Sequence, residues 1–210
     1  MKLYQSNASP NSRRVRMFLA EKNIAVSVIP VDLASRAQFS DAYQAINSRS
    51  QVPTLVLDDG TAIGEVLAIW RYLEEAYPEP PLLGKTPTSK ALVTMWERWV
   101  ELDGFLAVME GVRNRAAGLK GRALSGPHSY DQIPELVARS EWRTQDFYVD
   151  LDARLQTVPF IAGEEFSAAD ITGLATVDFA AKSFGVPLPG ELVALERWHR
   201  MISARTSAAA

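Results

Sequence analysis

A run of prolines between residues 78 and 87 constrains the fold of this chain more than any other feature. Proline lacks an amide hydrogen, and its ring clashes with the preceding helical turn, so a helix does not run through such a segment. The prolines are Pro78, Pro80, Pro81 and Pro87, within YPEPPLLGKTPTS. We therefore expect a first domain of residues 1–78, a linker of residues 79–88 and a second domain of residues 89–210.

The residues before the prolines alternate between strand and helix patterns. Strand patterns lie at residues 2–5, 26–31, 54–57 and 61–63, and helical patterns at 9–23, 39–46 and 65–76. The turn Asp58-Asp59-Gly60 joins the last two strands as a hairpin. The resulting order, βαβ-α-ββα, predicts an α/β domain with one mixed sheet covered by helices.

The residues after the prolines are helical almost throughout. Ser167 with Asp170 three residues later is a variant of the capping box that begins helices. The run that follows is apolar on nearly all sides, which is typical of a buried central helix. We expect an all-α bundle, with helices over residues 89–115, 133–155, 167–185 and 189–205.

Composition excludes several kinds of chemistry. The chain has no cysteine, which excludes disulfides, zinc–thiolate sites, iron–sulfur clusters and cysteine nucleophiles. Its two histidines, His128 and His199, cannot build a metal site without further ligands, so we expect solvated or capping roles for them and no metal. The phosphate-binding, dinucleotide-binding, serine-hydrolase and zinc-protease motifs are also absent.

Charge and hydropathy predict an ordinary soluble chain. The formal net charge of -3 gives no signal for nucleic acid or an anionic membrane surface. The N-terminus lacks the apolar core of a signal peptide, and no apolar run reaches the ~18 residues of a membrane span. We therefore expect a cytoplasmic protein without a nucleic-acid or membrane partner.

Pro53 stands at the mouth of a predicted strand, in QVPTLVLDDG. Proline is acceptable as the first residue of a strand, and an ordinary trans proline there would blunt a sheet edge. Peptide bonds before proline are also where cis bonds occur. A cis bond would turn the main chain of Val52 toward an extended ligand, in the manner of strand addition. Position alone leaves both interpretations open.

Two helix N-termini accompany this strand. Ser9 before Pro10 fits an N-cap followed by proline at the first helical position, and Glu65 precedes the third helix. Such ends carry free N–H groups and partial positive charge, which suit a thiolate or a carboxylate. A lone serine at such a position is more often only a cap.

Three stretches together resemble the cytosolic glutathione S-transferases, and the likeness covers the whole chain. They are INSRSQVPTLVLDDGTAIGEVLAIWRYLEEAYP, FIAGEEFSAADI with the buried capping box Ser167 and Asp170, and ERWHRMISAR. The resemblance implies a thioredoxin-like N-terminal domain and an α-helical C-terminal domain. It further implies glutathione as cosubstrate, a homodimer, and no metal.

The resemblance also assigns roles to residues of the first domain. Val52 before a cis Pro53 would hold the cysteinyl backbone of glutathione, and Glu65 with the N–H of Val66 its γ-glutamyl end. Gln38 and Gln51 fall where side chains reach the γ-glutamyl and glycyl portions. The stretch SPNSRRVR resembles the serine-type motif, so the Ser9 hydroxyl would stabilise the thiolate. Neighbours that could replace Ser9 are Asn7, Asn11 and Ser12.

The acceptor and the reaction are less constrained. Conjugation to small hydrophobic electrophiles is the leading expectation, with an acceptor site near Phe105, Met109 and Arg113. A glutathione-dependent disulfide or peroxide reductase and a non-catalytic binding protein of the same fold are the alternatives. Val66 stands where the family has serine, which removes a hydrogen bond worth ~1–3 kcal/mol and predicts weaker glutathione binding.

Overall fold

The computed structural model describes residues 1–210, and the chain divides into two compact units. The first unit comprises Met1–Pro80, Ser125–His128 and Ala210, and the second comprises Pro81–Leu124 and Ser129–Ala209. The boundary at Pro80 lies within the proline-rich segment. A short piece from the later half of the sequence therefore belongs to the first unit.

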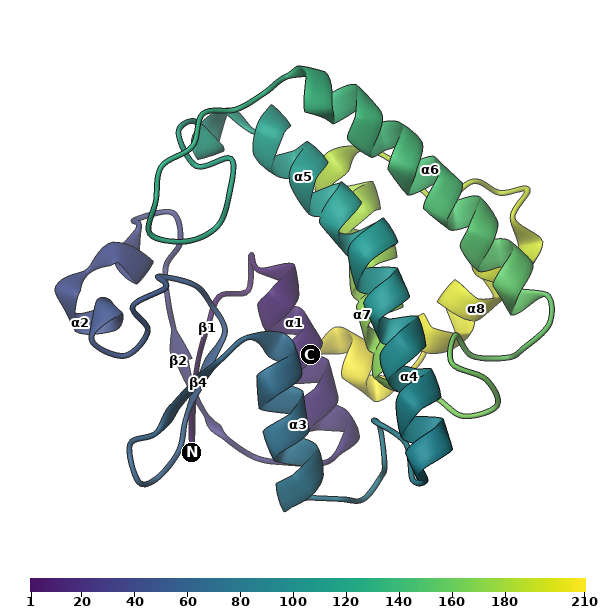
Figure 1. Ribbon diagram of the computed structural model, residues 1–210, viewed down its shortest axis with the longest axis horizontal. Coiled ribbons are helices and arrows are strands. Elements are labelled where there is room, and N and C mark those ends of the chain that lie inside the picture. Colours follow the sequence, from purple (N-terminus) through teal and green to yellow (C-terminus); the bar gives the residue numbers. More distant parts are fainter. The chain divides into compact units, whose positions relative to one another are not determined.

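The first unit contains a four-stranded sheet with the strand order β2-β1-β3-β4 (Figure 1). The first strand pairs in parallel with β2 and antiparallel with β3, and β3 pairs antiparallel with β4. This mixed sheet and the order βαβ-α-ββα confirm the predicted thioredoxin-like fold. The elements are β1 (Lys2–Gln5), α1 (Pro10–Glu21), β2 (Ser27–Pro30), the 3-10 turn η1 (Ala37–Phe39), α2 (Asp41–Gln44), β3 (Thr54–Val56), β4 (Ala62–Gly64) and α3 (Val66–Ala76).

Apolar side chains join the sheet to α1 and α3. Leu3 of β1 and Leu55 of β3 are fully buried, as are Phe18 of α1 and Trp70 of α3. The rings of Phe18 and Trp70 stack with their centroids 5.2 Å apart. Burial of side chains of this size stabilises the unit by roughly 2–3 kcal/mol each. The core thus fixes where both helices begin relative to the strands.

The helix predicted over residues 39–46 is wrong in its extent. The segment is the short turn η1 followed by the one-turn helix α2. Ser40 separates the two because its backbone is extended, with φ -67° and ψ 147°. Its hydroxyl accepts a hydrogen bond from the amide of Tyr43 at 3.3 Å, so Ser40 caps α2 and a continuous helix is interrupted there.

The second unit is built from helices and contains no named strand, as predicted (Figure 1). Its helix α7 is buried on nearly every side, again as the apolar pattern predicted. The elements are α4 (Pro87–Trp99), the π-helical turn η2 (Val100–Phe105), α5 (Leu106–Arg115), η3 (Ala117–Leu119), α6 (Glu135–Leu155), α7 (Ala168–Phe179), η4 (Ala180–Phe184), α8 (Val193–Ser203) and η5 (Thr206–Ala209).

The helix predicted over residues 89–115 corresponds to α4, η2 and α5 in succession. It begins at Pro87 because the Thr86 hydroxyl caps it, accepting from the amide of Ser89 at 3.1 Å. Gly104 lies in the π-helical turn, and a Cβ atom at this position would come within 2.6 Å of the Phe147 ring of α6. Only glycine therefore permits the close approach of these two helices.

The predicted capping box is confirmed at the start of α7. The Asp170 carboxylate accepts from the Ser167 amide at 3.0 Å and from the Ser167 hydroxyl at 3.3 Å. It also accepts from the Ile161 amide at 3.0 Å and from Nε1 of Trp198 in α8 at 2.9 Å. One fully buried carboxylate therefore joins the start of α7 to a preceding loop and to α8.

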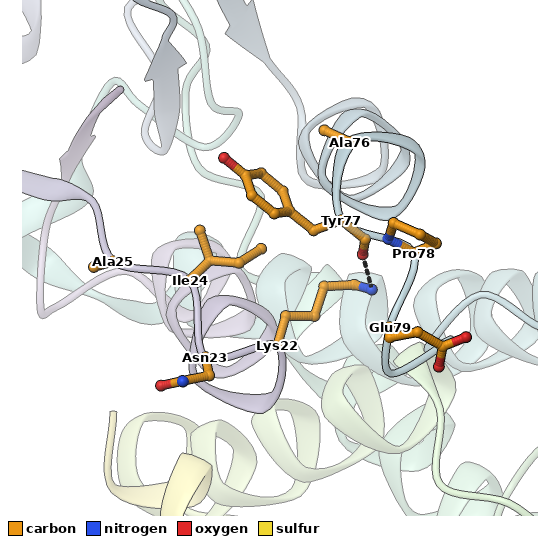
Figure 2. Close-up of a pocket in the computed structure, with 8 residues that line it drawn as sticks. All are labelled: Lys22, Asn23, Ile24, Ala25, Ala76, Tyr77, Pro78 and Glu79. Carbon is orange, nitrogen blue, oxygen red and sulfur yellow. Dashed lines mark hydrogen bonds between the residues drawn. The ribbon is translucent and has the colours of Figure 1, made fainter.

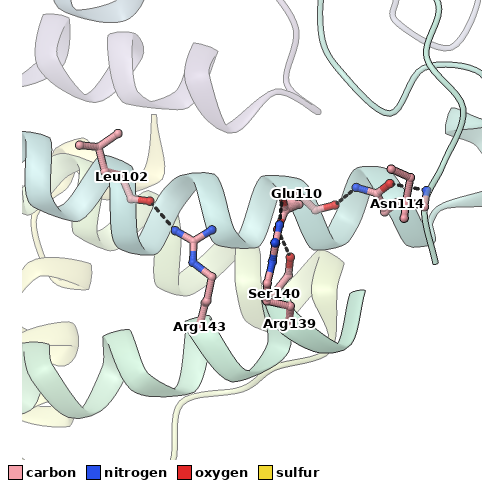
Figure 3. A network of polar contacts seen from close by, with 7 residues as sticks. Leu102, Glu110, Asn114, Arg139, Ser140 and Arg143 are labelled. Carbon is pink, nitrogen blue, oxygen red and sulfur yellow. Dashed lines mark hydrogen bonds and ion pairs between the residues drawn. The ribbon is translucent and has the colours of Figure 1, made fainter. Parts of the chain in front are cut away.

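Polar contacts fix the register of α5 against α6 (Figure 3). Glu110 accepts from Nη2 of Arg139 at 2.9 Å and from the Ser140 hydroxyl at 2.8 Å. Arg143 donates to the Leu102 carbonyl at 2.9 Å.

None of the helices in the chain combines the length and the apolar character that a membrane crossing requires.

Candidate functional site

One edge of the sheet brings together segments that are far apart in the sequence. Because β3 runs antiparallel to β1 and β4, the end of β1, the start of β3 and the end of β4 meet there. Ile29, Tyr4, Thr54 and Gly64 form one row across the four strands, and we call this end of the sheet the candidate edge. The segments that leave it lead to Ser9, Gln38, Val52-Pro53 and Glu65-Val66.

Ser9 caps α1 as the sequence predicted. It is 8% exposed, and its hydroxyl oxygen accepts from the Ser12 amide at 3.2 Å. A serine hydroxyl also carries one hydrogen that it can donate, and no acceptor within the chain takes the hydrogen of Ser9. The Ser9 hydroxyl is thus fixed by the helix that it caps, while its donor remains available to an anion at the helix N-terminus.

The three neighbours that could replace Ser9 have other contacts. Ser12 is fully buried, and its hydroxyl accepts from the Ser6 amide at 3.3 Å. Asn7 is exposed and accepts from the side chain of Gln5 at 3.0 Å. Asn11 accepts from Nη1 of Arg14 at 3.1 Å. Each of these contacts occupies an acceptor oxygen and leaves the donor hydrogens of the side chain without a partner in the chain, as in Ser9. The choice of Ser9 among the four therefore rests on the resemblance of SPNSRRVR to the serine-type motif.

Val52 and Pro53 are joined by a cis peptide bond, so the cis interpretation of this segment is confirmed. Neither the amide nor the carbonyl of Val52 forms a hydrogen bond within the chain. Val52 is half-buried and lies two residues before the first residue of β3, Thr54. It therefore presents an unpaired main-chain donor and acceptor at the candidate edge, as strand addition requires.

Glu65 and Val66 begin α3 from the same edge. Glu65 is exposed, makes no capping hydrogen bond with its side chain, and has φ 64° and ψ 130°. A residue with a Cβ atom pays for such a backbone conformation with about 1–3 kcal/mol, and such strain gathers at ligand-binding positions. Val66 is 6% exposed, so its side chain belongs to the core and only its amide faces the helix N-terminus.

Two glutamines complete the set from the first unit. Gln38 is 6% exposed, and its Oε1 has no hydrogen-bond partner. A buried amide oxygen without a donor costs about 1–3 kcal/mol, so a ligand N–H at this point would relieve it. Gln51 is half-buried, and its carbonyl accepts three hydrogen bonds from the chain.

The predicted acceptor residues belong to the second unit. Phe105 is 2% exposed and packs in the core, whereas Met109 is half-buried. Arg113 is anchored to the loop that follows α5, where it donates to the carbonyls of Arg122 at 2.6 Å and Leu124 at 2.8 Å. Of the three side chains, Met109 is the one that is partly exposed and not held by hydrogen bonds.

One segment near the site was missed by the sequence reasoning. Ser125–His128 belongs to the first unit, and a Cβ atom on Gly126 would lie 3.9 Å from the Arg49 carbonyl and from Nε2 of Gln51. From the sequence we expected only a solvated or capping role for His128. The one available signal was the turn composition of Ser125-Gly126-Pro127, which predicts a loop but not what it contacts.

A hollow of about 440 Å³ lies elsewhere in the first unit, between the C-terminal ends of α1 and α3 (Figure 2). Its lysine, Lys22, donates to the carbonyls of Tyr77 and Pro80 at 2.7 Å each and pairs with Glu74 at 2.8 Å. These acceptors occupy all three ammonium hydrogens. The length of α1, about 18 Å, separates this hollow from the candidate edge.

No group of three or more His, Asp or Glu side chains is placed to hold a metal ion.

Comparisons with known proteins agree with this geometry. The family described as "Glutathione S-transferase, N-terminal domain" matches residues 3–81. Glutathione S-transferase 2 of Saccharomyces cerevisiae is 34% identical over 215 residues, covering 99% of this chain and 87% of that protein. The maleylacetoacetate isomerase of Rattus norvegicus is 43% identical over 95 residues, 44% of each chain.

A solved structure extends the likeness to the whole fold. The glutathione S-transferase domain-containing protein of Marinobacter aquaeolei VT8 superposes with a TM-score of 0.91 at 32% identity, covering 99% of both chains. The candidate edge, with its cis proline and two helix N-termini, thus occurs in a chain that is similar to glutathione S-transferases from end to end. The chain belongs to the glutathione S-transferase family.

Proposed function

We propose that the first unit binds glutathione along the candidate edge and that the protein transfers its sulfur to a small hydrophobic electrophile. The observation that carries the proposal is the unpaired main chain of Val52, which lies between the N-termini of α1 and α3. Four strands at their usual spacing span roughly 14 Å, and an extended tripeptide spans about 10 Å. The edge is therefore wide enough for a tripeptide lying across it.

Each part of glutathione would meet a matching group. The cysteinyl backbone pairs with the amide and carbonyl of Val52. The γ-glutamyl end meets the N-terminus of α3, where the Val66 amide suits its carboxylate and the Glu65 carboxylate suits its ammonium group. Gln38 and Gln51 offer amide groups to the γ-glutamyl and glycyl portions. The missing serine hydroxyl at Val66 weakens this binding.

The reaction begins with loss of the thiol proton to water. The Ser9 hydroxyl donates a hydrogen bond to the resulting thiolate, and the N-terminus of α1 adds favourable electrostatics, so the thiol pKa falls. The sulfur then attacks an electrophilic carbon. A carbon–sulfur bond forms, and the leaving group departs with the electron pair of the bond that breaks. Holding both reactants together contributes further to the rate.

The acceptor site is proposed on the second unit, at Met109 with Phe105 and Arg113 as supporting residues. An apolar side chain such as Met109 suits a hydrophobic electrophile, since sulfur is polarisable and methionine adapts to varied shapes.

A homodimer is part of the same proposal. Exposed apolar residues on the helices α4 to α5 support it, namely Leu92, Met95, Leu102 and Leu106.

Substitution of Ser9 by alanine tests the proposed chemistry. A hydrogen bond to a charged group contributes about 1.5–3 kcal/mol, so we expect kcat/KM with an aryl halide to fall about 10- to 100-fold. The glutathione dissociation constant, measured by calorimetry, should change little. Equal rates in wild type and Ser9→Ala would remove Ser9 from the mechanism. A loss confined to Asn7→Ala, Asn11→Ala or Ser12→Ala would transfer the role to that residue.

A second candidate is a glutathione-dependent isomerase of an unsaturated diacid. It is favoured by the 43% identity to the rat maleylacetoacetate isomerase, although that match spans 44% of this chain. The same thiolate would add to the double bond, and rotation and elimination would return it, so no thioether product would accumulate. Isomerisation of maleylacetoacetate without activity on aryl halides would select this candidate.

The same assays separate the two remaining alternatives. Reduction of a small disulfide would select a glutathione-dependent reductase. Failure to bind millimolar glutathione would leave a non-catalytic protein of the same fold.

A further inference from the structure

A closed hydrogen-bond network surrounds the carbonyl of Gln51, one residue before the cis proline. The Tyr43 hydroxyl donates to this carbonyl at 2.6 Å, and Nδ2 of Asn47 donates to it at 3.1 Å. Nδ2 of Asn47 also donates to the Thr54 hydroxyl at 2.8 Å, which lies 3.1 Å from the Tyr43 hydroxyl. The three side chains thus hold one another as well as the carbonyl.

The network is well fixed in the first unit. Tyr43 is 5% exposed and Thr54 is fully buried. Burial raises the pKa of the Tyr43 phenol, so this hydroxyl keeps its proton. Asn47 also binds the start of the loop, because its Oδ1 accepts from the Arg49 amide at 2.9 Å. Every hydrogen-bonding group in the network has a partner, which makes such a cluster rigid.

The planarity of the peptide bond connects this network to the candidate edge. The Gln51 carbonyl and the Val52 N–H belong to the same peptide unit, which is trans. In a trans peptide these two groups point in opposite directions. Because the carbonyl is drawn into the Tyr43–Asn47–Thr54 network, the Val52 N–H points away from it, and no acceptor within the chain takes this hydrogen.

The loop itself does not relax into an easier conformation. Ser50 has φ 53°, in the left-handed region that residues with a Cβ atom rarely adopt. Its hydroxyl accepts from Nε2 of Gln44 at 3.0 Å. Such strain persists only where the surrounding contacts over-determine the backbone. The network supplies those contacts directly after Ser50.

We propose that Tyr43, Asn47 and Thr54 are positioning residues, which aim the Val52 N–H at a main-chain carbonyl of the ligand and thereby orient the cysteinyl sulfur. This inference rests on the proposed function, since it assigns the ligand to glutathione. None of the three side chains needs to touch the ligand. Their effect is exerted through one peptide plane.

The test compares Tyr43→Phe with Tyr72→Phe. The first variant removes the shortest hydrogen bond to the Gln51 carbonyl and keeps the ring. Tyr72 provides the control, because it is a half-buried tyrosine of the same unit that lies within α3 rather than at the candidate edge, and its hydroxyl forms no hydrogen bond within the chain. We expect the glutathione dissociation constant and KM of Tyr43→Phe to rise about three- to tenfold, the usual scale of one lost hydrogen bond. The KM for the aryl halide and the constants of Tyr72→Phe should stay unchanged.

Asn47→Asp provides an independent variant. Its carboxylate keeps the acceptor for the Arg49 amide but replaces both donors, so it repels the Gln51 carbonyl and should weaken glutathione binding more than Tyr43→Phe does. Urea unfolding of every variant separates stability from binding. A loss of stability in Tyr43→Phe with an unchanged glutathione dissociation constant would overturn the inference and leave a purely structural network. Failure of the wild type to bind glutathione would instead overturn the proposed function itself.

Discussion

At the scale of single residues, the backbone angles separate what folds the chain from what the site needs. Four residues other than glycine have positive φ: Asn23, Arg36, Ser50 and Glu65. Asn23 follows α1, close to the hollow at the far ends of the helices, whereas Glu65 lies at the candidate edge. The same kind of strain thus occurs at one position with a proposed ligand and at one without.

Substitution of Glu65 by glycine should stabilise the protein and weaken glutathione binding. Glycine adopts φ 64° without steric cost, so we expect a gain of up to about 1 kcal/mol in the free energy of unfolding. Loss of the carboxylate removes the partner of the γ-glutamyl ammonium group, so the glutathione dissociation constant should rise severalfold. Urea unfolding and calorimetry measure the two effects separately.

Asn23→Gly is the matched control for Glu65. It also relieves a positive φ, although by less, because asparagine tolerates this region better than most residues. It should leave glutathione affinity unchanged. If Glu65→Gly bound glutathione as tightly as Asn23→Gly does, the Glu65 carboxylate would have no part in the site.

The sequence predicted the N-cap at Ser9 and the prolyl bond at Pro53 because the signals of both are local. Ser9 before Pro10 identified an N-cap, and the prolyl bond at Pro53 identified a possible cis peptide. The network on the Gln51 carbonyl could not be predicted, because Tyr43 and Thr54 lie 11 residues apart and meet only in the folded unit. The extent of α2 was missed for a similar reason, since a serine within a helical pattern does not reveal that it caps a new turn.

At the scale of elements, helices α1 and α3 begin at the same edge of the sheet and are linked at their C-terminal ends. Their N-termini reach the candidate edge, and their C-terminal ends meet at Lys22 (Figure 2). The Lys22 side chain is fully buried. Its ammonium group donates to the carbonyls of Tyr77 and Pro80, which lie in the segment that follows α3. A buried lysine in a place of this kind was not evident from the sequence, which showed only a charged residue at the end of an amphipathic helix.

Lys22→Met should destabilise the first unit without changing its chemistry. The variant keeps the apolar stem but takes the cation away from Glu74 and from two carbonyls, at a cost on the order of 3 kcal/mol. Glutathione affinity should be unchanged at temperatures where the variant is folded, because the length of α1 separates Lys22 from the edge. Urea unfolding and calorimetry provide the two measurements.

The control lies on the same helix. Arg71 and Glu75 form an exposed ion pair at 3.2 Å on α3, and such pairs contribute about 0.3–0.5 kcal/mol. Arg71→Met should therefore change the free energy of unfolding far less than Lys22→Met. Equal effects of the two substitutions would show that Lys22 does not hold the helix ends together.

At the scale of the whole molecule, the chain divides within the proline-rich segment, and the buried helix α7 of the second unit begins at the capping box of Ser167 and Asp170. What the sequence could not reveal is how polar some of that interior is. Glu97 of α4 is 2% exposed and accepts from the Thr172 hydroxyl of α7 at 3.1 Å. Hydrophobic periodicity does not identify a charged side chain whose partner comes from another helix.

The stability of the second unit should depend on pH through Asp170. Burial raises the pKa of this carboxyl to about 6 from its ordinary value of 3.8, while its four donors oppose the shift. Between these two pH values the folded state binds a proton that the unfolded state has released. The contribution to stability is therefore fully present below pH 4 and is lost as the pH rises through 6, by on the order of 3 kcal/mol in the free energy of unfolding.

Asp170→Asn removes this titration while keeping the shape of the side chain. The variant should be less stable at every pH, since the amide nitrogen cannot accept the hydrogen bonds from Ser167. The decisive quantity is the difference in unfolding free energy between wild type and variant, which should shrink from pH 4 to pH 7. Urea titrations followed by tryptophan fluorescence measure it, because Trp198 contacts the carboxylate directly. A difference that stayed constant over this range would mean that Asp170 is ionised throughout, and that its four donors outweigh the effect of burial.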